Sequence, residues 1–220
     1  AYALEGDNWV YTLAGFGKAV TFKQANGSLT IGSGTRAQGL TATGGDVRIT
    51  VDGGGLTVAD NISAAGSVAL QATSITAAAK VTTAGAKVTL EAAGAMHLYG
   101  EVDAGTGTVV LASGSSVNQT GAIKADSLAL RGQAVFQRNG SGNHVRALAG
   151  EGQWIEYTQA EDLTIGTVDG IHGLTATAAF VKVNVTDGAL KIEQAVSANA
   201  AVELSAAALE LDATITSAAR

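Results

Sequence analysis

The stretch that decides the fold covers residues 45–72 and reads GDVRITVDGGGLTVADNISAAGSVALQA. Apolar and polar side chains alternate in residues 47–51 and again in residues 56–58, a pattern that is typical of strands with one buried face. Glycines and small polar residues separate the two runs, and they favour turns. The stretch therefore predicts short β-strands joined by tight turns.

The same layout recurs along the chain with a short period. Leu70, Leu90, Leu111 and Leu130 follow one another at intervals of 19 to 21 residues. A second apolar position recurs at nearly the same interval, at Ile62, Val81, Val102 and Ile123. A repeat of this length cannot bury its apolar face alone, so successive repeats must stack. We expect an all-β fold, a parallel β-helix (solenoid), with coils of about 20 residues.

A longer period shows an internal duplication. Residues 29–85 align without a gap on residues 163–219, an offset of 134 positions, with 21 identities among the 57 pairs. The upstream residues follow at an offset of 135, which pairs Asn8 with Asn143 and Leu13 with Leu148. We therefore divide the chain into a first β-helical unit, residues 1–140, and a second, truncated unit, residues 141–220, within one continuous solenoid. A solenoid normally needs polar caps, so we expect the chain to be an excerpt of a longer array.

Composition limits the core and the partners. The chain is 46% hydrophobic but only 5% aromatic, so Ala, Val, Leu and Ile must fill its core. Proline is absent, which agrees with strands that use every backbone donor in a ladder. Thirteen basic and nineteen acidic residues give a net charge of -6 without a basic patch, so we expect no nucleic-acid partner. No apolar run is long enough for a spanning helix, so we expect no membrane insertion.

The motif of residues 45–72 resembles the filamentous haemagglutinin family of large secreted exoproteins. A glycine turn, an alternating strand, a second strand, an Ile-Ser-Ala step and another glycine turn carry the resemblance. It is clear over residues 28–125 and 163–219 and looser over residues 1–27 and 131–162. Members of that family are exported by two-partner secretion and form long right-handed β-helical shafts that serve adhesion, biofilm formation or toxin delivery.

The resemblance implies a function without chemistry. We expect the structural shaft of a secreted bacterial cell-surface adhesin or filament, located outside the cell, that mediates attachment or biofilm formation. Its partner would be a receptor or glycan on a host or neighbouring cell, which the sequence does not identify. A self-assembling extracellular fibre, made by end-to-end stacking of β-helices, is the alternative, and a β-helical polysaccharide-active enzyme is a weaker one.

Candidate catalytic and metal-binding residues are sparse. His97, His144 and His172 stand in no metal-ligand spacing, and we expect them on the surface or in turns. The nearest carboxylate pairs are Glu101 with Asp103 and Glu161 with Asp162, which have the character of solvated turn residues. We therefore predict no catalytic residues, no metal site and no cofactor. Thr-x-Thr pairs occur, but too irregularly for an ice-binding array.

Two further patterns have both a structural and a functional interpretation. Five Asn-x-Ser/Thr triplets are possible glycosylation sites in a secreted protein, although Asn also favours turns. The triplets begin at Asn26, Asn61, Asn118, Asn139 and Asn184. Aromatic residues gather at equivalent places in both units. Their recurrence favours the interpretation that they fill a wider coil, rather than that they form a binding surface. These residues are Trp9, Tyr11, Phe16, Phe22, Trp154 and Tyr157.

Overall fold

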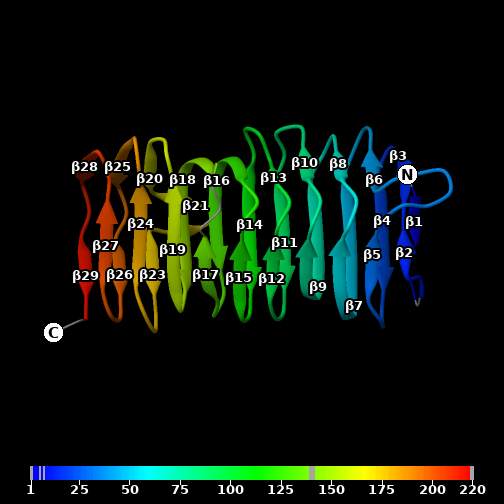
Figure 1. The fold of residues 1–220 in the computed structure, drawn as a ribbon, viewed down its shortest axis with the longest axis horizontal. Coiled ribbons are helices and arrows are strands. Elements are labelled where there is room, and N and C mark those ends of the chain that lie inside the picture. Colours follow the sequence, from blue (N-terminus) through cyan, green and yellow to red (C-terminus); the bar gives the residue numbers. More distant parts are fainter. Residues whose placement is uncertain (1, 5, 7, 139–141, 219–220) are drawn as a thin grey trace.

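The chain folds as a parallel β-solenoid of about ten coils that advance by about 21 residues each, which confirms the predicted fold class. The computed structural model describes residues 2–4, 6, 8–138 and 142–218. In Figure 1 the coils stand side by side along a rod, with the two ends of the chain at opposite ends. No helix occurs among the described residues, so the Ala-rich runs follow the solenoid register, and Ala77 ends a strand.

Three parallel ladders form the faces of the first part of the rod, and the long strands bend at a corner so that they serve two faces. Face 1 comprises β1 (Tyr2–Leu4), β4 (Val20–Gln24), the first halves of β7 (Val47–Val58) and β9 (Val68–Ala77), β11 (Val88–Ala92), β14 (Thr108–Ser113), the second half of β16 (Ile123–Arg131) and β18 (His144–Gly152).

Face 2 comprises β2 (Thr12–Leu13), β5 (Leu29–Ile31), the second halves of β7 and β9, β12 (Met96–Leu98), β15 (Ser116–Gln119) and β17 (Val135–Arg138). Face 3 comprises β3 (Gly15–Gly17), β6 (Leu40–Ala42), β8 (Ile62–Ala64), β10 (Val81–Thr83), β13 (Val102–Asp103) and the first half of β16.

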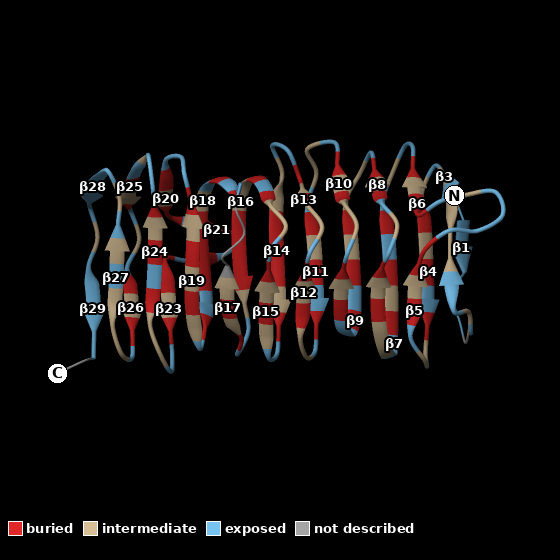
Figure 2. Cartoon of the chain, in the orientation of Figure 1, coloured by how far each residue is buried: buried red, intermediate tan, exposed pale blue. Residues whose placement is uncertain are grey.

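Inward-facing side chains stack in rows from coil to coil. Val47, Val68, Val88 and Val109 are direct partners on face 1, and each is fully buried. Figure 2 shows the buried positions as a band through the middle of the rod, whereas the end coils are exposed. Burying a Val or Leu side chain contributes about 1.5–3 kcal/mol, so these rows hold the coils together.

The faces exchange at the boundary between the two units. β19 (Trp154–Gln159) is the counterpart of β4, which belongs to face 1, but β19 pairs with β17 of face 2. β18 is long enough to pair with two strands of the next coil. The second unit then continues as three ladders: β19, β24 (Val181–Val185) and β27 (Val202–Ser205); β20 (Leu163–Ile165), β25 (Ala189–Ile192) and β28 (Ala208–Leu211); β23 (Leu174–Ala176), β26 (Val196–Ala198) and β29 (Ile215–Ser217).

Equivalent strands of the two units therefore lie on different faces of the rod as well as on different coils. Six pairing steps separate β5 from β19 along one ladder. β20, the counterpart of β5, is the next strand of that coil and lies on the next face. One period of 134 residues thus makes six and about one third coils, a rise of about 30 Å at one strand spacing per coil.

Candidate functional site

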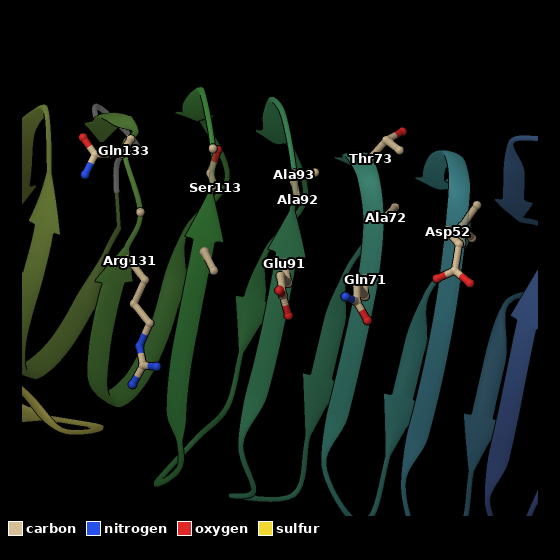
Figure 3. A pocket seen from close by; sticks show the side chains of 14 residues that line it. Asp52, Gln71, Ala72, Thr73, Glu91, Ala92, Ala93, Ser113, Arg131 and Gln133 are labelled. Atoms are coloured by element: carbon tan, nitrogen blue, oxygen red, sulfur yellow. The ribbon is translucent and has the colours of Figure 1, made fainter. Parts of the chain in front are cut away.

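A shallow groove of about 520 Å³ crosses five coils at the end of face 1 (Figure 3). Its floor consists of small residues, because the strand ends on adjacent coils put Ala72, Ala92 and Ser113 in register. Polar side chains stand along its rim: Asp52, Gln71, Thr73, Glu91, Arg131 and Gln133. The sequence analysis missed this groove, and the signal for it was the run of small residues after each face 1 strand.

The charged groups at the two ends of the groove already have partners. Lys23 Nζ lies 3.1 Å from Asp52 Oδ2, and an Arg131 guanidinium nitrogen lies 2.7 Å from Asp169 Oδ2. Glu91 is the groove carboxylate that has no ion pair within the described part of the chain. General acid–base hydrolysis of a glycoside needs two carboxyl groups that flank one bond. The groove can therefore hydrogen-bond a polar ligand, and of its two carboxylates Asp52 is held in an ion pair with Lys23.

The predicted pair Glu101 and Asp103 belongs to a network of ion pairs. Lys80 Nζ lies 2.6 Å from Glu101 Oε1 and 3.1 Å from Asp103 Oδ2, and Lys124 Nζ lies 2.7 Å from Glu101 Oε2. Hydrogen bonds from Lys124 and Lys80 lower the pKa of Glu101, and hydrogen bonds to Glu101 and Asp103 raise the pKa of Lys80. Both shifts favour the charged forms, so the network ties neighbouring coils together.

The second predicted pair is also occupied by local contacts. Glu161 Oε2 lies 2.5 Å from His144 Nδ1, and Asp162 Oδ1 accepts a hydrogen bond of 2.8 Å from the Ala189 backbone N–H. His172 Nδ1 lies 2.9 Å from Thr167 Oγ1, and both His144 and His172 are exposed. His97 points outward and stacks on Tyr99 with 6.0 Å between ring centroids. The described residues contain no cluster of metal-ligating side chains.

The possible glycosylation sites lie on the outer surface where the structure describes them. Asn26 and Asn61 occupy exposed turns, and Asn118 and Asn184 are outward-facing strand residues. Asn61 Oδ1 also accepts a hydrogen bond from the Lys80 backbone N–H at 3.1 Å. Asn139 lies outside the described residues. Accessibility agrees with modification, which stays a prediction.

The aromatic residues divide into two groups. Phe22 and Tyr157, equivalent residues of the two units, are fully buried in the coils at the start of each unit, as the wider-coil interpretation predicts. Trp154 is half-buried and packs edge-on against Phe180 at 4.7 Å. Trp9, Tyr11 and Phe16 are exposed by 65% or more on the N-terminal coils. The recurrence therefore reflects packing for the buried members only.

A β-hairpin outside the solenoid is a second feature that the sequence analysis missed. β21 (Thr167–Val168) and β22 (Ile171–His172) leave the rod between β20 and β23 and lie back over the first unit (Figure 1). Val168 and Ile171 pack on outward-facing residues of three successive coils, Val110, Ala129 and Ala149. An Asp-Gly turn between apolar residues is a hairpin signal, and Asp169-Gly170 supplied it.

The turn of this hairpin is anchored by charge. Asp169 adopts a left-handed backbone with φ of 51°, which Asp tolerates better than most residues. Its carboxylate lies 2.7 Å from Lys87 Nζ and 2.7 Å from an Arg131 nitrogen, and its carbonyl accepts a further hydrogen bond from Arg131. The hairpin thus links the start of the second unit to Lys87 and Arg131, which lie 82 and 38 residues before Asp169 in the chain.

Removing the anchor is expected to release the hairpin. In Asp169→Ala we expect a loss of about 1–2 kcal/mol, because two ion pairs disappear and Ala is disfavoured at positive φ. Amide hydrogen exchange over residues 167–172 should rise, while exchange in β9 and β11 stays unchanged. Asp187→Ala, which removes a carboxylate from an exposed turn of the second unit, is the matched control. Equal exchange in both variants would show that the anchor contributes nothing.

No protein-family model, curated protein or solved structure matches this chain. The fold class is therefore what the structure itself defines, a parallel β-solenoid with an internal duplication. Within the described residues there is no helix of sufficient length and apolar character to cross a membrane.

Proposed function

We propose that this chain is a section of the structural shaft of a secreted bacterial cell-surface adhesin or filament that mediates attachment or biofilm formation. The observation that carries the proposal is the continuity of the backbone ladders: parallel pairing runs from β1 to β29 and passes through the unit boundary. Each coil between the first and the last is hydrogen-bonded to the coils on both sides of it, so an axial load is shared among many bonds.

The surface supports a mechanical role over a catalytic one. The carboxylates that the sequence brings close together are held by lysines, a histidine or backbone N–H groups. The groove is shallow, and its charged rim residues at both ends are paired. In this proposal, receptor or glycan recognition belongs to another part of the adhesin, and the chain sets the distance of that part from the cell.

Two experiments test the shaft proposal. Immunogold labelling of the producing bacteria with an antibody against this chain should place gold outside the cell along thin surface filaments. Label confined to the cytoplasm would contradict the proposal. The isolated chain should also show no saturable binding to a glycan array or to host cells, whereas specific binding there would make the groove or the aromatic residues a receptor site.

A further inference from the structure

The ladders of the solenoid join each coil to the coils directly beside it. Along face 1, β11 pairs with β9 and β14, and β16 pairs with β14 and β18. In a one-dimensional array of this kind, stability is a sum of terms for single coils and for adjacent pairs, so coils can open one after another. A contact that reaches past the nearest coil changes this behaviour, because it stabilises several interfaces at once.

The hairpin of β21 and β22 makes contacts of this longer reach. It leaves the coil of β20 and β23, two strands that both pair with β18. Val168 and Ile171 then pack on one residue from each of the three preceding coils: Ala149 of β18, Ala129 of β16 and Val110 of β14. Asp169, at the tip, extends the contact to Lys87, which directly precedes β11 on the fourth preceding coil.

The outer surface of face 1 is apolar where the hairpin covers it. One row of outward-facing residues runs from coil to coil, and it contains Arg48 and Thr89 before it reaches the coil of β14. Under the hairpin the same row consists of Val110, Ala129 and Ala149, which are 3%, 0% and 0% exposed although they face away from the core. These three residues form the seat of the hairpin, an apolar cluster separate from the main core.

The first unit has an equivalent loop without the residues that make these contacts. Each loop is closed by a hydrogen bond between two glycines: Gly39 N–H to Gly32 O at 3.0 Å in the first unit, and Gly173 N–H to Gly166 O at 2.9 Å in the second. At the positions of Val168, Asp169 and Ile171 the first unit has small, uncharged residues, which are Gly34, Thr35 and Ala37. The loop therefore belongs to the repeat, whereas the apolar pair and the charged tip belong to the second unit.

We propose that the hairpin of residues 167–172 is a clamp that joins four coils into one cooperative block: the coils of β14, β16 and β18 and the coil that carries β20 and β23. The hairpin crosses all three interfaces between these coils. Opening any one interface requires the hairpin to detach from its seat, and the other two interfaces then lose the same contribution. The four coils therefore open together across the boundary between the two units, whereas coils outside the block open singly.

Native-state amide hydrogen exchange in Leu111→Ala tests the clamp. Leu111 is fully buried in β14, and losing its side chain should accelerate exchange in this coil on the order of a hundredfold. The first half of β7 and β23 both lie three pairing steps from β14, in opposite directions along the rod. We expect the acceleration to reach β23 but not β7, because only β23 belongs to the block.

A hairpin that carries the residues of the first unit removes the clamp and keeps the loop. In a background with Val168→Gly, Asp169→Thr and Ile171→Ala, the effect of Leu111→Ala should no longer reach β23 and should stay with β14 and its direct neighbours. Thr35→Ala, at the first-unit position equivalent to Asp169, is the matched control. It should leave the one-sided spread of the effect unchanged.

Two outcomes would overturn the proposal. Equal effects of Leu111→Ala on β7 and β23 with the natural hairpin would exclude the clamp, and so would a one-sided spread that persists in the triple variant. Circular dichroism verifies that each variant keeps its β structure, and Val109→Ala, a smaller truncation in the same strand, repeats the test if Leu111→Ala does not fold. The result leaves the shaft proposal unaffected, since the exchange of a single chain does not depend on where the chain is located.

Discussion

Replacing Gly39 with alanine is expected to destabilise the first unit by about 3 kcal/mol, the sum of a left-handed backbone penalty and overpacking. Gly39 has φ of 63°, and a Cβ atom there would lie 2.0 Å from the backbone oxygen of Asn61 on the next coil. The coils are joined by backbone hydrogen bonds at this corner, so the oxygen cannot retreat without opening the ladder. Urea unfolding followed by circular dichroism measures the change.

Two further substitutions calibrate that result. Gly173→Ala repeats the experiment in the second unit, where φ is 70° and the new Cβ would lie 2.0 Å from Ala195 O, so we expect a loss of similar size. Gly15→Ala is the control, because nothing lies within 4 Å of its Cβ position, and we expect a change within about 0.5 kcal/mol. If Gly39→Ala matched Gly15→Ala, the tight corner would have no energetic role.

Gln159→Leu is expected to have the other large effect, a loss of about 3–5 kcal/mol at the unit boundary. The Gln159 side chain is 3% exposed. Its oxygen accepts hydrogen bonds from Val145 N–H at 3.1 Å and Tyr157 O–H at 2.7 Å, and its nitrogen donates to the backbone oxygens of Val145, Glu161 and Asp162. Leucine has a similar volume but can neither accept the hydrogen bond from Val145 N–H nor donate to the backbone oxygens.

The first unit provides the comparison for this prediction. Gln24, the counterpart of Gln159, accepts a hydrogen bond from Val10 N–H at 3.1 Å and donates to Gly27 O at 3.1 Å. Gln24→Leu leaves fewer groups unpaired, so we expect a smaller loss of about 1–3 kcal/mol. Thr158→Ala, an outward-facing neighbour, should be nearly neutral. Hydrogen exchange of β19 and β20 localises the effect, and equal losses in Gln159→Leu and Thr158→Ala would contradict the role of the buried amide.

The boundary explains why glutamine and asparagine are buried in an otherwise aliphatic core. Near the unit boundary residues 144–145 have ladder partners on β16, and residues 158–159 have ladder partners on β24. Asn143 donates to Thr158 O at 3.1 Å and accepts from Ile123 N–H at 2.9 Å, so its amide replaces ladder bonds. The pairing of Asn8 with Asn143 and of Gln24 with Gln159 was visible in the sequence, but its purpose was not.

The sequence by itself determined the fold class, the coil length to within about a residue and the duplication. These features are readable because every coil presents nearly the same surroundings to its inward positions, so the same residue types recur at Leu70, Leu90 and Leu111. The strand pairs predicted from that recurrence are direct ladder partners in the structure. Periodicity records a local, repeated constraint.

Only the tertiary structure decided the exchange of faces, the groove and the hairpin that lies across the boundary. Equivalent strands change face because the 134 residues of one period make about six and one third coils, not a whole number. The lengths of the individual turns set that number of coils. In the hairpin, Asp169 contacts Lys87, which lies 82 positions earlier. The sequence around either residue contains no pattern that predicts this contact. Contacts between distant, non-repeating positions leave no period in the sequence, and for that reason they became visible only when the coils were stacked.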